Sequence, residues 1–365
     1  MSLTATLGPI RTTAPRAAGA LNPISTFSAL LADVKGAGLL ARTRVFYISV
    51  FTTLVLALGG AITGFLLLGD SWFQLIIAGV LGIIFTQFAF LGHEASHRQV
   101  FESGRANDRV GRVLSSGLVG ISYSWWMNKH SRHHANPNTV GKDPDIEVDT
   151  IAFLEEDAAD ARGLRAWITR HQGALFIPLL AFEGFNLHVK SFGHIFGRGK
   201  VDNRALEISL IAVRMAIVIG AIFYVLPVGM AFAFIGVQMV VFGIYMGTSF
   251  APNHIGMDII PAGTKMDFLN KQVRTGRNIR GGRWMTFFMG GLNHQVEHHL
   301  FPSMARPHLW KARRMVREVC AREGIPYTET TLARAWVAVI EYMNRVGLYA
   351  GASFDCPVAA DYRRP

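Results

Sequence analysis

The sequence predicts an all-α integral membrane protein, with four membrane-spanning helices in two hairpins and a cytosolic helical cap. Three observations predict this fold class. Half of the 365 residues are hydrophobic and only 17% are charged, a composition that is unusual for a soluble globular protein. Long apolar stretches occur as two pairs, and a short turn separates the members of each pair. Basic residues are concentrated in the polar regions that flank these pairs.

The N-terminal region precedes the first apolar pair. Residues 1–25 are rich in Ala, Thr, Pro and Gly and lack an apolar core, so we expect a disordered cytosolic start without a secretory signal. Apolar side chains then recur at helical spacing over residues 26–41, which predicts a helix lying on the membrane surface. We expect one domain over residues 26–350, followed by a C-terminal tail at 351–365.

Four stretches are long and apolar enough to cross a bilayer core of about 30 Å, at about 1.5 Å per helical residue. They lie at about 45–68, 72–92, 208–226 and 230–250. The third stretch contains Arg214 near its start, and we expect this side chain to extend to the lipid headgroups. The turns within the two pairs carry no basic residue. The positive-inside rule therefore predicts that both termini and the long polar regions are cytoplasmic.

Two further apolar segments are not predicted to span the membrane. Residues 110–126 are interrupted by Gly, Ser and Arg112, which favours an interfacial or re-entrant segment. Residues 174–196 carry polar and charged side chains, including Glu183 and Lys190. This pattern favours an amphipathic helix at the membrane surface.

Charge and cysteine content exclude several classes of function. The formal net charge is +11, and in a chain this apolar such an excess indicates loops facing anionic lipid rather than nucleic acid. The two cysteines, Cys320 and Cys356, form no CxxC pair. The sequence therefore suggests neither a disulfide framework nor a thiolate metal site.

Histidines are grouped in the predicted cytoplasmic regions. HEASH lies at the end of the second span, HSRHH follows in the first polar region, and HQVEHH lies after the fourth span, with one further histidine between them. The candidate metal ligands are His93, His97, His130, His133, His134, His254, Gln295, His298 and His299. Residues three and four apart share a face of a helix, so each group can direct its side chains at one ion. Eight imidazoles exceed the needs of one ion, which predicts two metal ions; imidazole suits iron, copper or zinc.

Three other interpretations explain the histidines less well. Chance or packing explains a single HxxxH pair about as well as metal binding, but it explains three such groups poorly. HEASH also matches the HExxH zinc-protease pattern, in which the glutamate is a general base. That alternative leaves both HH pairs unexplained, and the third and fourth spans contain no Asp as a further ligand. A metal transporter would place its sites near the middle of the bilayer, whereas these histidines lie at the cytoplasmic ends. Among the other histidines, we expect His171 and His308 to be surface residues and His188 and His194 to pack or to support the site.

At these residues the sequence resembles the membrane fatty-acid desaturase superfamily, whose signature is three histidine boxes. HEASH, HSRHH and QVEHH match the forms HxxxH, HxxHH and QxxHH, and the similarity includes HHANPNTVGKDPDI and NHQVEHHLFP. It covers about residues 26–347. The QxxHH form is similar to that of front-end desaturases and of bacterial linoleoyl-CoA-desaturase-like proteins, so we expect a multi-pass protein of a bacterial plasma membrane.

The resemblance implies that the box histidines bind two iron ions, so that the cytosolic cap carries a diiron site, with no catalytic residues beyond the metal ligands. His254 matches the additional family histidine beyond the fourth span. Gln295 stands where many relatives have His, and it binds directly, through water or not at all. His294 compensates only if the local helix turns it inward. An Asn that some relatives use is replaced by Phe250.

The implied activity is the O2-dependent desaturation of a fatty acyl chain, carried as acyl-CoA or acyl-lipid, to a cis double bond. The alternative is a hydroxylase of the same superfamily. The HPGG motif of a fused cytochrome b5 domain does not occur, so we expect electrons from a separate ferredoxin or cytochrome-type carrier with its reductase. The basic cluster Arg313, Arg314 and Arg317 is expected either to dock an acidic carrier or to contact lipid headgroups.

Overall fold

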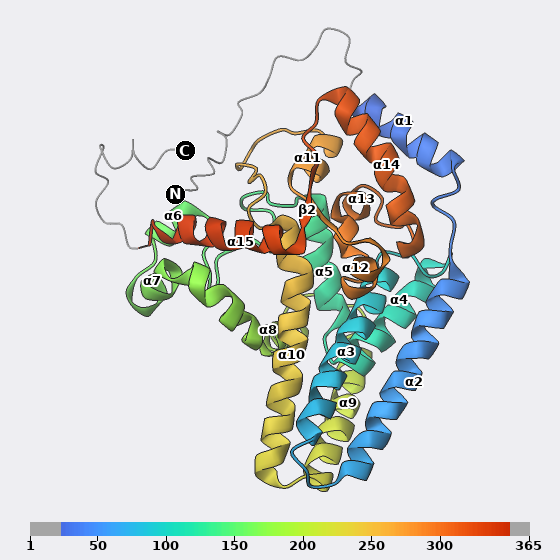
Figure 1. Ribbon diagram of the computed structural model, residues 1–365, viewed down its shortest axis with the longest axis vertical. Coiled ribbons are helices and arrows are strands. Elements are labelled where there is room, and N and C mark those ends of the chain that lie inside the picture. The colour runs from blue at the N-terminus through green and yellow to red at the C-terminus, as the bar shows by residue number, and fades with distance from the viewer. Residues whose placement is uncertain (1–22, 351–365) are drawn as a thin grey trace, which may run out of the picture.

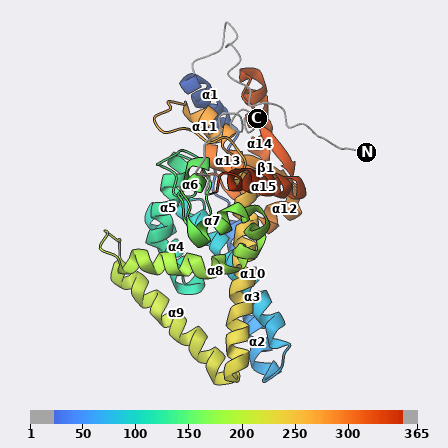
Figure 2. The same ribbon diagram turned by 90° about the vertical axis from the view of Figure 1, so that its left-hand side faces the viewer.

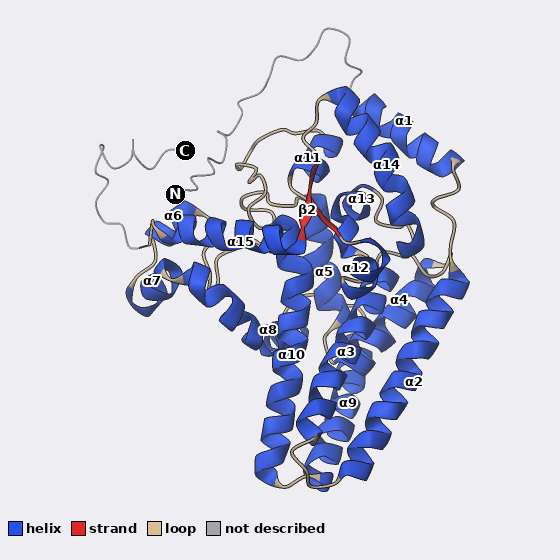
Figure 3. Cartoon of the chain, viewed as in Figure 1, coloured by secondary structure: helices blue, strands red, loops and turns tan. Residues whose placement is uncertain are grey.

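The computed structural model describes residues 23–350, which are mostly helical (Figure 3). The predicted tail at 351–365 and most of the predicted disordered start, residues 1–22, lie outside the described residues. The first half of the described chain contains α1 (Pro23–Gly36), α2 (Arg44–Leu68), α3 (Gln74–Ser96), α4 (Gly104–Arg112), the π-helix η1 (Val113–Val119), α5 (Tyr123–Ala135), α6 (Glu155–Ala159), α7 (Gly163–Arg170) and α8 (Gln172–Phe196). The second half contains α9 (Arg204–Val225), α10 (Val228–His254), α11 (Phe268–Arg274), β1 (Arg277–Arg280), α12 (Gly282–Phe288), the 3-10 helix η2 (Leu292–His294), α13 (Gln295–Leu300), α14 (Arg306–Glu323), β2 (Thr328–Thr331) and α15 (Leu332–Gly347).

Four of the described helices, α2, α3, α9 and α10, are long and apolar enough to cross a membrane, which confirms that prediction. Helices α2, α3 and α10 run along the long axis of the molecule (Figure 1), whereas α9 is inclined to it (Figure 2). The α2–α3 and α9–α10 connections lie at the same end. The Gln74 side chain closes the first connection by donating hydrogen bonds to the carbonyls of Phe65 and Gly69, at 2.7 and 2.9 Å. It thereby satisfies carbonyl groups at the end of α2, which have no partner within the helix.

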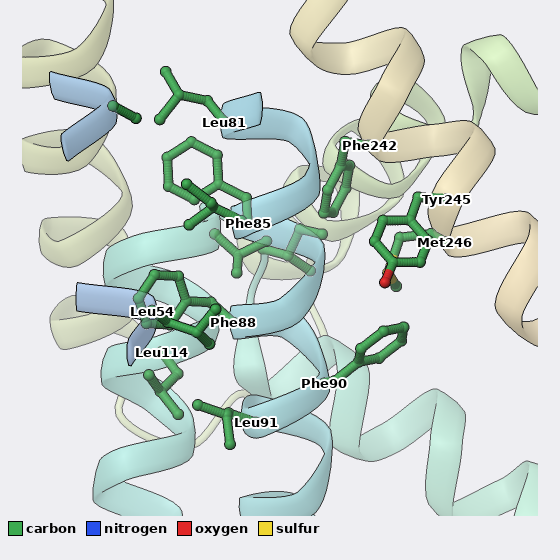
Figure 4. Packing of buried hydrophobic residues seen from close by; sticks show 14 of the residues in the cluster. Leu54, Leu81, Phe85, Phe88, Phe90, Leu91, Leu114, Phe242, Tyr245 and Met246 are labelled. Carbon is green, nitrogen blue, oxygen red and sulfur yellow. The ribbon is translucent and has the colours of Figure 1, made fainter. Parts of the chain in front are cut away.

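Helix α3 lies at the centre of the bundle, between α2, α10 and η1. Figure 4 shows Phe85 and Phe88 of α3 with Leu54 of α2 on one side and Phe242 of α10 on the other. All four side chains are buried. At Gly82 the two central helices approach so closely that a Cβ atom would lie 2.8 Å from the carbonyl oxygen of Gln238 on α10. This packing fixes the end of α3 from which the first histidine box projects.

Arg214 on α9 does not extend to the headgroups, so that expectation is wrong. Its side chain is buried, and its Nε donates a 2.9 Å hydrogen bond to the carbonyl of Leu118 in η1. The guanidinium also lies over the ring of Phe85, 5.3 Å from the centroid. Leu118 lies in the last turn of η1, where the carbonyls of a helix have no partner within it, and Arg214 satisfies one of them within the bundle.

The two segments that were predicted not to span are helical. Residues 110–126 comprise the end of α4, all of η1 and the start of α5, with a left-handed turn at Gly120. Helix α8 is one continuous helix of 25 residues that is not among the four candidate spans. It lies across the direction of the bundle (Figure 2).

The remaining elements form a cap at the end of the bundle opposite the two connections (Figure 1). The strands β1 and β2 pair in parallel, with Arg277 opposite Thr328. Helix α1 packs on α14 and α11, with Leu30 and Val34 in a separate apolar core of the cap. The short parallel pair was not predicted, because its strands are four residues long and polar.

Candidate metal centre

The first histidine box lies on the last turn of α3. His93 belongs to the helix and His97 is its C-terminal cap, so the two imidazoles lie on the same face. Nε2 of His93 lies 3.0 Å from Nε2 of His130, and Nε2 of His97 lies 2.7 Å from the same atom. The first and second boxes therefore meet directly.

The second box lies on α5, which begins after Ser122, whose side chain accepts a hydrogen bond from a backbone N–H of the first turn. His133 and His134 are consecutive residues of α5, so their side chains point in different directions from the helix axis. Nε2 of His133 lies 3.3 Å from Nε2 of His254, at the end of α10. The ring of His134 stacks on the ring of His299, with centroids 4.1 Å apart.

The third box lies on the short helix α13, directly after η2. The ring centroid of His298 lies 4.8 Å from that of His93 and 4.7 Å from that of His97. His299 faces the other way and lies 4.8 Å from His254. Adjacent residues of one helix thus contribute to two different clusters.

All eight predicted histidines come together, as two neighbouring clusters. The five-histidine group consists of His93, His97, His130, His134 and His298, and the three-histidine group consists of His133, His254 and His299. Within each group, one ring nitrogen from every histidine lies within 4.8 Å of the others. Each group is therefore compact enough to surround one ion.

The chemistry of these side chains fits metal ions. Both ring nitrogens of His134, and Nε2 of His298 and of His299, are buried without a hydrogen-bond partner among the described residues. Buried polar atoms normally have partners, and a metal ion between these nitrogens would supply the missing ones. Imidazole is a common ligand of iron, copper and zinc.

Burial also keeps the histidines in the form that binds metal. It lowers the pKa of His97 to about 3, and it lowers the pKa of His130, His134 and His298 well below the usual value. These imidazoles are neutral at physiological pH, and each retains a lone pair. Burial alone would lower the pKa of His133 as well, but the carboxylates near it raise that pKa.

Proteins of similar sequence identify the family of this chain. The family model for fatty acid desaturases matches residues 70–331, more than half of the chain. This chain belongs to the fatty acid desaturase family. The resemblance inferred from the three boxes is thereby confirmed, and the desaturase is an oxidoreductase.

Several similar desaturases come from eukaryotes. A Delta(8)-fatty-acid desaturase of Helianthus annuus is 27% identical over 327 residues, which cover 84% of this chain and 69% of that protein. An acyl-lipid (9-3)-desaturase of Physcomitrium patens is 30% identical over 280 residues, which cover 74% of this chain and 52% of that protein. A Delta 8-(E)-sphingolipid desaturase of Kluyveromyces lactis is 27% identical, with 91% of this chain and 61% of that protein covered.

The remaining candidate of the third box lies beside the three-histidine group of this desaturase. The side-chain nitrogen of Gln295 is 2.8 Å from Nε2 of His254, and its oxygen accepts a 3.1 Å hydrogen bond from Asn253. His294 is not turned inward to either group, since its Nε2 lies 3.3 Å from the hydroxyl of Thr286.

The other histidines have roles outside the two groups. His188 is buried, with Nδ1 2.7 Å from the carbonyl of Gly184, and it packs α8 against η1. His171 is exposed, as expected. His308 is only half-buried, and its Nδ1 lies 2.8 Å from the carbonyl of Leu39.

The glutamate of HEASH does not face the histidines as a free base. The carboxylate of Glu94 forms two 2.6 Å hydrogen bonds with the guanidinium of Arg306. Both side chains are almost completely buried. In a zinc protease of the HExxH type this carboxylate would instead have to be available to a metal-bound water, so the ion pair argues against that alternative.

Several supporting residues were missed at the sequence level. The carboxyl of Glu297, between two box positions, accepts hydrogen bonds from Asn278 at 2.7 Å and Tyr327 at 2.8 Å, and burial raises its pKa to about 7. Gln272 lies 2.9 Å from Nδ1 of His299. The only available signal was the position of Glu297 within the box, because the partners lie in distant segments.

Proposed function

We propose that this desaturase introduces a cis double bond into a fatty acyl chain at two non-haem iron ions, with O2 and external electrons as co-substrates. The observation that carries the proposal is the convergence of eight histidines from four separate segments into two neighbouring groups. The relatives named as acyl-lipid and sphingolipid desaturases support an acyl chain held on a lipid, and an acyl-CoA is the other carrier.

The ligands proposed for the two irons are the eight histidines, with Gln295 as a ninth residue beside His254. When bound, the irons would supply the oxidising chemistry with O2 that an unactivated methylene requires and that amino-acid side chains lack. The chain's own task is to keep the imidazoles neutral and to exclude water. Trp126 stacks on His130, with centroids 4.6 Å apart, and Phe250 lies 6.2 Å from His93. These rings supply an apolar wall next to the five-histidine group.

We further propose that residues 26–350 form one domain, with the four spans as two membrane hairpins and the cap in the cytoplasm. Basic residues flank the cap side of the spans, whereas the two short connections carry none. Both termini would then be cytoplasmic, in a multi-pass protein that we assign to a bacterial plasma membrane.

The electron donor is proposed to be a separate acidic protein, a ferredoxin or a cytochrome with its reductase. Helix α14 offers Lys311 and Arg317 as exposed cations for docking. Arg313 and Arg314 contribute less, because they pair with Glu329 and Glu318. The same exposed cations also suit contact with lipid headgroups.

Expression of the chain in a host with a defined lipid composition tests the reaction. We expect acyl chains that have lost two hydrogen atoms, detected by mass spectrometry of the extracted lipids. An acyl chain that has gained an oxygen atom would instead identify the hydroxylase alternative. Conversion under anaerobic conditions, or without an electron donor, would contradict the O2-dependent mechanism.

The variant His134→Ala tests the metal ligands. His134 has two buried nitrogens without partners and contacts both groups, so its removal is expected to abolish desaturation and lower the iron content. Insertion into the membrane should remain, because His134 lies outside the spans. The control is His171→Ala, an exposed histidine outside both groups. Unchanged iron and unchanged activity in His134→Ala would overturn the assignment.

A further inference from the structure

Asp143 is a buried carboxylate that the proposed reaction does not use directly. It lies eight residues after Ala135, the end of α5, and its side chain has no exposed surface. Both of its oxygens lie 3.0 Å from Nδ1 of His133. The backbone N–H groups of Asn138 and Asp145 also donate to it, at 2.7 and 2.9 Å. The loop is therefore folded around this carboxylate.

The same loop is tied to the end of α10. Asn138 has a left-handed backbone, with φ of 49°, and its side chain donates to the carbonyls of His254 and Asp258. The loop thus holds Asp143 in a fixed position relative to both His133 and His254. Such rigidity is typical of residues that orient a metal ligand.

This geometry determines which nitrogen of His133 is free. A carboxylate accepts hydrogen bonds, so Nδ1 of His133 carries the proton and Nε2 carries the lone pair. Nε2 is the atom that lies 3.3 Å from Nε2 of His254, inside the three-histidine group. A carboxylate behind an imidazole also increases the basicity of the opposite nitrogen.

Asp143 is not positioned as a ligand of a third ion. His133, Asp143 and Asp145 lie close enough together to surround a cation, but the N–H donors around Asp143 already point at its oxygens. The carboxylate of Asp145 lies 3.3 Å from Nδ1 of His133, farther than that of Asp143, and it forms an ion pair with Lys129, which provides its positive charge.

In the other two members of the three-histidine group, the partner of the Nδ1 atom is uncharged. Nδ1 of His254 lies 2.8 Å from the carbonyl of Thr275, and Nδ1 of His299 lies 2.9 Å from the amide oxygen of Gln272. In the five-histidine group, by contrast, Nδ1 of His93 and both nitrogens of His134 have no partner among the described residues. The two groups are therefore supported differently.

We propose that Asp143 is a positioning residue that holds His133 as an Nε2 ligand, so that the ion in the three-histidine group depends on it and the ion in the five-histidine group does not. The inference rests on the proposed function, in which both groups bind iron. It predicts that removing the charge of Asp143 costs one iron rather than two.

The test is the iron content of the purified full-length enzyme in detergent, measured after dialysis against increasing concentrations of a chelator. Wild type is expected to hold two irons per chain. Asp143→Asn should lose one of them at about 10- to 100-fold lower chelator concentration, with one of two Mössbauer signals disappearing. Glu147→Gln, whose partner Arg132 is half-exposed like itself, is the matched control and should resemble wild type.

A second comparison separates positioning from general damage to the fold. His133→Ala should give the same one-iron enzyme, and adding Asp143→Asn to it should cause no further loss, because Asp143 acts through His133. Loss of both irons together in Asp143→Asn, or a further loss in the double variant, would overturn the proposal. If Asp143→Asn does not fold, Asp143→Ala decides by the same titration, since it removes both oxygens that accept from Nδ1.

The outcomes distinguish the two proposals. A wild-type enzyme that binds no iron would refute the proposed diiron function itself. A wild-type enzyme with two irons, both retained equally by Asp143→Asn, would refute only the role of Asp143.

Discussion

Glu94 and Arg306 are 212 residues apart in the sequence, yet their side chains form a two-point ion pair inside the protein. The hydroxyl of Tyr47 on α2 accepts the backbone N–H of Arg306 at 3.2 Å and lies 3.5 Å from Glu94. One residue of the first box thus joins α2, α3 and the start of α14. Because His93 is its neighbour on α3, the pair also fixes the angle at which the first box enters the metal centre.

Breaking this pair is expected to destabilise the protein. Glu94→Gln leaves the buried guanidinium of Arg306 without a counter-charge, at a cost of about 3–5 kcal/mol. The measurement is the thermal unfolding midpoint of the detergent-solubilised protein. Arg314→Ala is the control, because its pair with Glu318 is exposed and adjacent on one helix. Equal midpoints for the two variants would show that the buried pair contributes nothing.

At the scale of elements, α5 carries three of the eight histidines, and its start is held by α9. Glu207, in the first turn of α9, is fully buried and accepts hydrogen bonds from the hydroxyls of Ser122 and Ser124, both at 2.6 Å. It also pairs with Arg112 at the end of α4, at 3.1 Å. One carboxylate therefore connects α4 and α9 to the start of α5, the helix that carries the second box.

We expect Glu207→Gln to weaken both the fold and metal retention. The amide keeps one acceptor but loses the charge opposite Arg112, and each charged hydrogen bond that is lost costs about 1.5–3 kcal/mol. Iron content and thermal midpoint should fall together. Asp202→Asn is the matched control, because only the backbone carbonyl of Asp202 contacts α5, through Ser124. If both variants behaved alike, the anchoring role of Glu207 would be excluded.

The whole molecule separates its apolar and polar parts along its long axis. The four long helices expose apolar side chains outward, such as Val45 at 79% and Leu67 at 81% exposed on α2. Such exposure suits a lipid environment, in which the backbone groups of a helix are satisfied within the helix. The histidine groups lie where α3 and α10 end, at the end opposite the short connections (Figure 1).

Cysteine labelling in intact cells tests the proposed orientation. In a variant without Cys320 and Cys356, Asp70→Cys in the first connection should react with an impermeant maleimide added from outside. Lys265→Cys in the cap should react only after the membrane is permeabilised, since the basic side is proposed to be cytoplasmic. Both positions are exposed, so accessibility does not limit the reaction. The reverse pattern would invert the topology.

The sequence alone determined the class of the protein and the identity of its candidate ligands. Apolar length and composition identify the four long helices, because burial in lipid is demanded of each helix separately. The spacing of three and four residues in HEASH and HSRHH places imidazoles on one helical face, because helical geometry is local. Family membership followed from the same short motifs and was confirmed by the match over residues 70–331.

Only the tertiary structure decided how the histidines divide into groups of five and three, and which residues support them. His298 and His299 are adjacent in the chain but belong to different groups, and no local pattern assigns them. Arg214 turns towards η1 rather than to the headgroups, because a carbonyl free of regular helical bonding lies within its reach. Asp143, Glu207 and Arg306 likewise act through partners brought close by packing between elements, and that packing depends on the whole chain rather than on any one segment.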